Sequence, residues 1–393
     1  MDTRFLKWLL TATFLFCMIF VAANVAAKKP VKPPPDDPCL SMESFSPDYV
    51  FYRDSGQRKN SKSTIFLAES DKGCERALVE IPTVGEDGRY IDIRYLKYSS
   101  FIEQGDTSGR VIWHSNSGTE EIVWSYDFYI SGTALIPDND GIRKILVTDD
   151  YWNKRVTDYD LSPDAATLAF QLYKKDPVTD EHVYSIRMID IDYCRALPSG
   201  CSYEDETAVM RAETEPEVDF NYSVDDPAWD PLGRRVYFFG KSDQGYKELQ
   251  FIEFDEGWEN GEWPPSFISG NLYSSEIQPE FQRVRRLASG MMGDTEYLAV
   301  EFPDGERINC GYIYFINVQD CENPNIVCHA DLKFAGTNPS WTKDGKVIHH
   351  YHDAKINRSV CSVWGGKVGL YDGIDVAELT DGYFPDGAGG LPE

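Results

Sequence analysis

A turn followed by an apolar strand recurs along this chain and limits what the chain can fold into. Copies of this element occupy residues 44–52, 160–170, 227–238 and 339–348. Each has an apolar anchor, a Pro-Asp or Asp-Gly type of turn, and then a short apolar run. Proline presets the first turn dihedral, and Gly or Asp tolerates the conformations that follow. Two of the three intervals between copies are nearly double the third. Each long interval is therefore expected to contain one degenerate copy, which gives six units in all.

A second element supports the same number independently. Each unit should contain a later strand that ends in an acidic residue, and six such residues recur at intervals of 52 to 65 positions: Asp71, Asp127, Asp190, Asp255, Asp320 and Asp372. The 23 Tyr, 21 Phe and 9 Trp favour sheet over helix. A β-sandwich pair or a solenoid could share this period, but long, turn-rich units favour a six-bladed β-propeller.

The repeats resemble those of TolB-type propellers, a family with WD40-like repeats. The motif is closest at Pro339–Lys346 and next closest at Pro227–Gly233, while Glu378–Gly382 resembles the end of such a blade. Residues 105–113 and 293–302 are weaker copies. The resemblance implies an all-β fold of six antiparallel blades, each with three or four strands. It says less about function, because the family includes protein-binding scaffolds, peptidase-associated domains and a few lyases or hydrolases.

The N-terminal segment predicts export to the periplasm or out of the cell. Arg4 and Lys7 precede an uncharged stretch, and Val25-Ala26-Ala27 provides small residues for a signal peptidase. Residues 1–27 are therefore expected to be a signal peptide, although their length also suits an uncleaved anchor. Residues 28–38 form a Pro-rich linker, and residues 39–393 are expected to form the propeller.

Cysteine usage agrees with an oxidising compartment. Without Cys17, which lies in the predicted signal, eight cysteines remain, and an even number in an exported chain suggests disulfides. Proximity predicts that two pairs each close a short loop after a strand and that two pairs form longer links. The short pairs are Cys194–Cys201 and Cys321–Cys328, and the long pairs are Cys39–Cys74 and Cys310–Cys361.

The net charge of the chain limits the kinds of partner that it can bind. A formal net charge of −27 argues against nucleic acid and anionic membrane surfaces, which attract clustered Lys and Arg. We expect no membrane insertion after signal cleavage. The negative charge serves solubility, or it favours a cationic protein or peptide partner.

One histidine cluster suggests a metal. His349, His350, His352 and Asp353 lie close together, and on a strand His350 and His352 share one face while His349 points to the other. Paired imidazoles beside a carboxylate could ligate a divalent ion. Pectate-fragment lyases with related propellers use histidines in this way, but they draw ligands from several blades. A polar strand at a blade edge is the competing interpretation.

Other candidate sites are isolated. Trp258 and Trp263 lie in a Gly- and Pro-rich segment, where they could anchor a partner or a sugar, or fold back over a blade edge. Arg283 and Arg285 would share one face of an alternating strand and offer a basic patch. Asp138–Gly141 and Asp158–Asp160 carry oxygen ligands that could bind Ca²⁺, but the first lacks the regularly spaced carboxylates and closing Glu of a calcium loop, so a tight turn is the better interpretation.

Two functions follow from these features. The first, which we favour, is a scaffold that binds a protein or peptide without catalysis and without a required cofactor. The alternative is a metal-dependent lyase or hydrolase acting on an anionic polysaccharide. Such a substrate would approach the acidic chain against electrostatic repulsion, unless its site were locally basic.

Overall fold

The computed structural model divides the chain into Met1–Leu40 and Ser41–Glu393. It describes residues 44–54, 62–71, 74–82, 92–103, 106–116, 120–137, 141–148, 154–175, 178, 182–202, 209–212, 226–242, 244–254, 267–303, 311–323, 325, 328–351, 367–381 and 383–387. The predicted signal and linker lie outside these residues. Among the described helices, none has the length and apolar character needed to cross a membrane.

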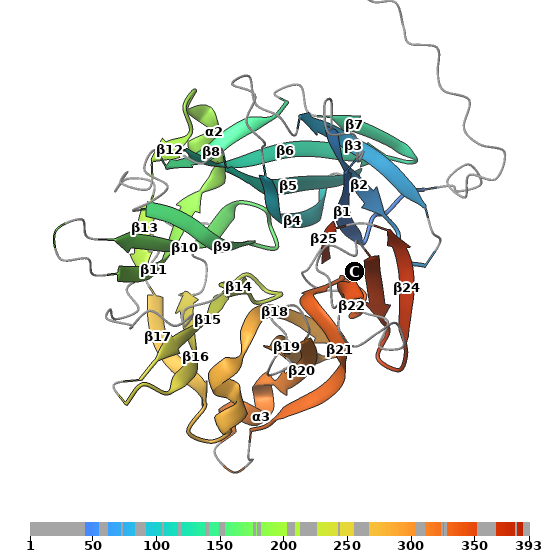
Figure 1. The fold of residues 1–393 in the computed structure, drawn as a ribbon. Coiled ribbons are helices and arrows are strands. Elements are labelled where there is room, and N and C mark those ends of the chain that lie inside the picture. The colour runs from blue at the N-terminus through green and yellow to red at the C-terminus, as the bar shows by residue number, and fades with distance from the viewer. Residues whose placement is uncertain are drawn as a thin grey trace, which may run out of the picture. The chain divides into compact units, whose positions relative to one another are not determined.

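The second unit is all-β, as predicted, and is built from antiparallel sheets (Figure 1). The first sheet has the strand order β25 (Tyr383–Gly387), β1 (Tyr49–Asp54), β2 (Lys62–Ala68), β3 (Glu75–Pro82). The second contains β4 (Asp92–Glu103), β5 (Asp106–Asn116), β6 (Glu121–Ser131) and β8 (Arg143–Thr148), with β7 (Ala134–Pro137) on β6 and β12 (Cys201–Ser202) parallel to β8. The third contains β9 (Lys154–Leu161), β10 (Thr167–Lys175), β11 (His182–Asp190) and β13 (Val209–Ala212).

The remaining strands form a fourth sheet and a longer hydrogen-bonded path. The fourth sheet contains β14 (Ala228–Trp229), β15 (Arg235–Lys241), β16 (Lys247–Phe254) and β17 (Phe267–Ser274). The path runs through β18 (Arg285–Met292), β19 (Thr295–Pro303), β20 (Gly311–Asn317), β21 (Ala330–Trp341), β22 (Val347–Tyr351), β23 (Lys367–Tyr371) and β24 (Val376–Asp381). Strand β21 divides this path, because Ala330–Ala335 pair with β20 and Gly336–Trp341 pair with β22.

Strands are present at all six places where the sequence predicted an acidic-ended strand, although Asp127 lies within its strand, Asp320 lies in the helix that follows, and Asp255 is outside the described residues. They correspond to β2, β6, β11, β16, β20 and β23. With the seven-stranded path divided at β21, the strands form six groups, whose first strands are β25, β4, β9, β14, β18 and β21. Each of the predicted strands is the third strand of its group. The weak copies near residues 105–113 and 293–302 are also strands, namely β5 and β19. The sheets follow one another in chain order around a centre, in the manner of a β-propeller (Figure 1).

The apolar core lies between consecutive sheets. In β10, Leu168 and Phe170 pack with Ile112 and Val123 of the second sheet, whereas Ala169 packs with Trp229 of the fourth. Similar clusters join the fourth sheet to β18–β20, and β22–β23 to the first sheet. Because successive side chains of a strand point to opposite faces, a strand buried on both sides is apolar throughout. This explains the unbroken apolar runs in the sequence.

The recurring turn has one geometry in three places. Its first residue is Ser162, Asp230 or Thr342, and its carbonyl accepts a hydrogen bond from the backbone N–H three positions later. That later residue has φ of +69° at Gly233 and +78° at Gly345. In the turn before β10 the same position is Ala165, with φ +61°. Alanine therefore occupies a left-handed position that glycine occupies in the other two turns.

Two of the predicted disulfides are present, Cys194–Cys201 and Cys321–Cys328. Each starts in a short helix rather than in the loop that we expected: Cys194 lies in α2 (Ile191–Ala196) and Cys321 in α3 (Val318–Glu322). The helices form because Asp190 and Asn317 accept backbone N–H bonds at their N-caps. Cys74 is disulfide-bonded. Its predicted partner Cys39 and the pair Cys310–Cys361 lie outside the described residues.

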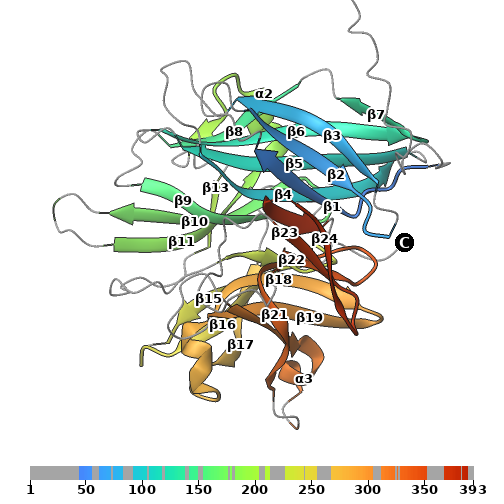
Figure 2. The same cartoon turned by 45° about the vertical axis from the view of Figure 1, so that its right-hand side comes forward.

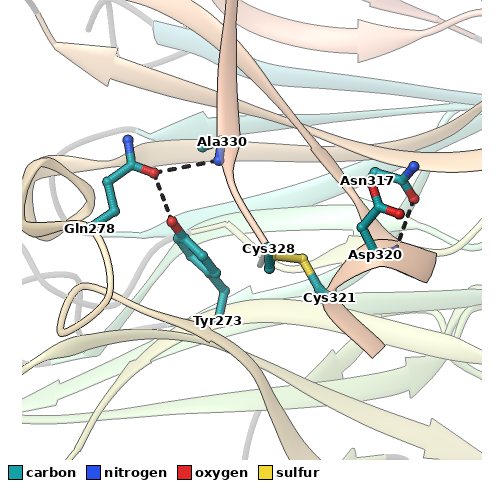
Figure 3. Close-up of a disulfide and its surroundings, with 7 residues drawn as sticks. All are labelled: Tyr273, Gln278, Asn317, Asp320, Cys321, Cys328 and Ala330. Carbon is teal, nitrogen blue, oxygen red and sulfur yellow. Dashed lines mark hydrogen bonds between the residues drawn. A yellow bond between two sulfur atoms is a disulfide. The ribbon is translucent and has the colours of Figure 1, made fainter. Parts of the chain in front are cut away.

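The second disulfide holds the start of β21 beside the fourth sheet (Figure 3). The Tyr273 hydroxyl donates to Gln278 Oε1 at 2.7 Å, and the Ala330 amide donates to the same oxygen at 3.4 Å. Tyr273 belongs to β17, so these bonds and α3 fasten two consecutive groups of strands.

The first sheet is completed by a strand from the far end of the chain. β25 pairs antiparallel with β1 and lies beside β4 and β22 (Figure 1). Figure 2 shows β23 close to β1, with which it shares an apolar cluster. The Gly387 amide donates to Ser340 Oγ of β21 at 2.9 Å. A Cβ on Gly387 would lie 2.0 Å from the Trp341 carbonyl oxygen, so only glycine fits this approach.

The turn geometry predicts opposite effects for two reciprocal substitutions. Gly233→Ala should lower the free energy of unfolding by about 1 kcal/mol, because φ +69° is strained for an L side chain while its new Cβ meets nothing closer than 3.7 Å. Ala165→Gly should not lower it, since glycine relieves the same strain. Urea unfolding of the two variants beside the parent measures both effects. A stabilising Gly233→Ala would contradict the assignment of these positions to one turn.

Candidate binding site

The first strands of the six groups converge on a central cavity of about 50 Å³. It is lined by Leu96 and Lys97 of β4, Asp158 and Tyr159 of β9, Asp226 and Pro227 before β14, Arg286 and Leu287 of β18, Asn338 and Pro339 of β21, and Asp386 of β25. Every group of strands therefore contributes residues to the lining of this cavity.

The backbone is irregular where these strands reach the cavity. The pairing register of β4, β9, β18, β21 and β25 shifts there, so that an additional residue is accommodated in each. Asp226, Arg286 and Asn338 have φ of +43°, +61° and +49°. A bulge re-aims the side chains that follow it. These bulges turn polar side chains toward the centre in strands whose other residues are mostly apolar.

A partly buried ammonium group joins three sheets at this cavity. Lys97 Nζ lies 3.2 Å from Asp160 Oδ1 and 3.6 Å from Asp386 Oδ1. Asp160 also accepts the Trp229 backbone N–H at 2.8 Å, and Asp386 accepts the Tyr98 N–H at 2.7 Å. The two carboxylates raise the pKa of Lys97 against the opposing effect of burial. Burial raises the pKa of Asp386 to about 6, although Lys97 opposes this shift.

Two further cations are held by carboxylates beside the cavity. Arg286 lies 3.8 Å from Asp158 and 3.9 Å from Asp226. Arg285 Nε donates to Glu301 Oε1 at 2.7 Å, and the Asn338 amide donates to the other oxygen of Glu301 at 3.0 Å. Burial raises the pKa of Glu301, and Arg285 and Arg286 oppose that shift.

The central cavity thus has little capacity for a large ligand. Its volume is sufficient for water, and its two cations, Lys97 and Arg286, each already lie beside two carboxylates. We interpret it as the electrostatic junction of the sheets rather than as the place where a polymer or peptide binds.

A second cavity of about 300 Å³ opens between the second and third sheets. We call it the 2/3 cleft. It is lined by Ser108, Gly109 and Arg110 of β5, by Asp127, Phe128 and Tyr129 of β6, by Asp164, Ala165 and Ala166 of the turn before β10, and by Asp192 of α2.

Arg110 fastens the walls of the 2/3 cleft to one another. Its guanidinium donates to both carboxylate oxygens of Asp127 at 2.7 and 2.8 Å, to Asp192 Oδ1 at 2.7 Å and to the Ala165 carbonyl at 2.5 Å. Arg195 of α2 lies 3.3 Å from Asp127 and donates to Ser125 Oγ at 2.6 Å. The two Asp carboxylates raise the pKa of Arg110 against the effect of burial. One buried guanidinium therefore connects β5, β6, the turn and α2.

The outer part of the 2/3 cleft is open to solvent. Tyr129 is 41% exposed, the Asp192 side chain is 73% exposed, and Asp164 is exposed as well. Phe128 is buried and its ring lies against Gly109, where an added Cβ would come within 2.5 Å of Cζ. The cleft consequently has a rigid floor and a rim that combines an aromatic ring with carboxylates.

The predicted metal ligands are placed only in part. His349 and His350 follow one another on β22 and are both buried, and His349 packs against Phe334 with ring centroids 4.7 Å apart. His352 and Asp353 lie outside the described residues. Within the described ranges, no three His, Cys, Asp or Glu side chains are grouped closely enough to hold a metal ion. The metal remains a prediction.

The predicted basic patch differs from its expected form. Arg283 ends the 3-10 helix η3 (Pro279–Arg283) and is exposed, whereas Arg285 begins β18 and pairs with Glu301. The prediction that Arg283 and Arg285 share one face of a strand was wrong, because Pro279 favours a helical turn and Arg283 belongs to that turn. Whether either arginine binds a partner is untested.

Three other candidates have mixed outcomes. Trp258 and Trp263, and the first three residues of Asp138–Gly141, lie outside the described residues. Of the other proposed calcium ligands, Asp158 lies beside Arg286 and Asp160 beside Lys97. These carboxylates already have cationic neighbours.

Sequence reasoning singled out Asp158 and Tyr159 of the central cavity, as part of a calcium motif, but it did not bring together the residues of either cavity. Lys97 and Asp386 belong to strands at opposite ends of the unit, and Arg110, Tyr129 and Asp192 belong to three different elements. Their one local signal was the Ser162-Pro163-Asp164 turn, where alanine follows instead of the glycine found in the other turns.

Comparisons with known proteins give structural neighbours only. No protein-family model and no curated protein matches the chain. Among solved structures, the β-propeller domain of the Trilobed protease from Pyrococcus furiosus, described as having an open velcro topology, is 13% identical, with a TM-score of 0.32 over 73% of this chain and 71% of that one. Prolyl oligopeptidase B from Galerina marginata, bound to a macrocyclization substrate, is 10% identical, with a TM-score of 0.41 over 88% of this chain and 45% of that one.

The central ion pairs predict a specific pH dependence. Because the pKa of Asp386 in the folded state lies above its ordinary value of 3.8, the folded protein binds this proton first as the pH falls. The contribution of Asp386 to the free energy of unfolding should therefore rise between pH 6 and pH 4, by up to about 3 kcal/mol relative to Asp386→Asn. Lys97, Asp160 and Asp226 face the same group and are common to both proteins.

Urea unfolding of the parent and Asp386→Asn at pH 7, 6, 5 and 4 measures this difference. A difference that stays constant over the series, or grows in the variant's favour on acidification, would contradict a raised pKa for Asp386.

Proposed function

We propose that this protein is an exported six-bladed β-propeller of the TolB type that binds a protein or peptide partner at the 2/3 cleft. The six third-position strands and the division of β21 between two groups support six blades. The pairing of β25 with β1 supports closure of the first blade by the C-terminal strand. The two disulfides support an oxidising compartment such as the periplasm or the cell exterior.

The observation that carries the binding function is the 2/3 cleft itself. Its volume of about 300 Å³ is at the lower end of ligand sites in proteins, and it suits a side chain rather than a polymer segment. The exposed ring of Tyr129 at its rim is a residue type that dominates the energetics of protein interfaces. Because Arg110 holds the walls together, little conformational entropy is lost when a partner binds.

The properties of the central cavity also favour the 2/3 cleft as the binding site. Its charged side chains are paired with one another, and its volume is about 50 Å³. Within the described residues, the enzyme alternative gains no specific support, since its proposed ligands His352 and Asp353 lie outside them.

A peptide selection with two matched variants tests the proposal. A random heptapeptide library is selected against the mature protein, and the enriched peptides are measured against Tyr129→Ala and Tyr312→Ala. Tyr312 of β20 is 40% exposed, close to the 41% of Tyr129, and does not line the cleft. We expect at least tenfold weaker binding to Tyr129→Ala and less than twofold change for Tyr312→Ala, as for the loss of one interface anchor.

Equal affinity for the two variants would place any binding elsewhere, and failure to enrich any peptide would argue against a peptide-binding role. Unsaturated products released from an anionic polysaccharide with added divalent metal, and lost in His350→Ala, would support the lyase alternative instead.

A further inference from the structure

We propose that the 2/3 cleft accepts one basic side chain, a lysine or an arginine, from an extended segment of the partner protein. This inference rests on the proposed binding function and specifies the chemistry of the residue that enters the cleft. It follows from the charge left over at the site, from the two unused carboxylate oxygens, and from the aromatic ring at the rim.

The charges of the cleft are one cation short of balance. Three carboxylates line the cleft, those of Asp127, Asp164 and Asp192, and the two guanidinium groups of Arg110 and Arg195 contact Asp127 and Asp192. Both oxygens of Asp127 are bound to Arg110. A single additional positive charge would neutralise the site, whereas an anionic group would add to an existing excess of negative charge.

Two carboxylate oxygens are left for that cation. Asp192 uses Oδ1 to accept from Arg110, and Asp164 uses Oδ1 to accept from Ser162 Oγ at 2.5 Å and from the Ala166 amide at 3.0 Å. Neither Oδ2 contacts another described residue. Hydrogen bonds from an ammonium or a guanidinium to such oxygens are the stronger, charge-assisted kind.

Tyr129 complements the carboxylates. Lysine and arginine carry long apolar stems behind their charged groups, and these stems pack on aromatic faces, where the cation also interacts with the ring. The exposed ring of Tyr129 offers such a face at the rim of the cleft. A purely apolar side chain would instead bury the two carboxylates without pairing them, which is costly.

The wall that carries Asp192 is held in place before any partner arrives. The Cys194–Cys201 disulfide closes the segment that begins in α2, the N-cap of α2 is Asp190, and Arg195 donates to Ser125 Oγ of β6. The opposite wall includes Ala165, whose carbonyl accepts from Arg110. A site with fixed walls distinguishes partners by charge and shape rather than by adapting to them.

Three peptide libraries separate this inference from the proposed function. They share one random heptapeptide design and differ at the central position, which is fixed as arginine, glutamine or glutamate. Retention on immobilised mature protein is compared for the parent, Asp164→Asn/Asp192→Asn, and the control Asp294→Asn/Asp375→Asn. The control removes two exposed carboxylates outside the cleft, so both double variants change the net charge equally.

We expect the arginine library to be retained at least tenfold better than the glutamate library by the parent protein. The cleft variant should lose this preference at least tenfold, while the control variant should change it less than twofold. If the cleft double variant does not fold, Asp164→Asn serves alone, since an asparagine Oδ1 can still accept the two hydrogen bonds of the turn.

Equal retention of the three libraries, abolished by Tyr129→Ala, would overturn the basic-residue inference and leave the binding function standing. A preference for arginine that the control variant loses as much as the cleft variant would mean nonspecific attraction to an acidic protein, and would overturn the inference too. Retention of none of the libraries would count against both proposals.

Discussion

The partly buried ammonium group of Lys97 is the interaction on which the arrangement of the first three sheets depends. It lies between Asp160 of the third sheet and Asp386 of the first, and it comes from the second. This set requires side chains from three sheets to meet at one point. The register shifts and the left-handed residues around the cavity follow from this requirement, because regular strands would point these side chains elsewhere. Backbone strain at the centre is offset by charge pairing.

The 2/3 cleft is also built from ion pairs between carboxylates and basic side chains, but it stays open to solvent. At the centre, each cation already lies between two carboxylates and the remaining volume suits water alone, whereas the 2/3 cleft is larger and its Asp164 and Asp192 carboxylates are open to solvent. Both cavities lie at junctions between sheets, where strands far apart in the chain bring side chains together. A repeated fold of this kind has several such junctions, and each can vary in charge without disturbing the apolar layers between the sheets.

Much of the fold could be predicted from the sequence because its signals are local. The turn before each strand and the apolar run after it are contiguous, and two cysteine pairs are seven residues apart. Helix α2 was missed because its single turn depends on the N-cap Asp190, and η3 because Pro279 overrides strand alternation at Arg283. The cleft could not be predicted, since Arg110, Tyr129 and Asp192 meet only through the packing of two sheets. The histidine cluster was a local pattern, but on β22 its first two members point into different buried surroundings.

The pairing of β25 with β1 has a consequence for how the chain acquires its structure. Until β25 pairs with β1, the first sheet consists of β1, β2 and β3, and β1 presents an unpaired backbone edge. Such an edge can pair with another chain. The contact that protects it joins residues separated by most of the sequence, which is the kind of contact that forms slowly. The earliest strands to be synthesised are therefore among the last to be completed, and during that interval β1 is a point where association with a second molecule competes with folding.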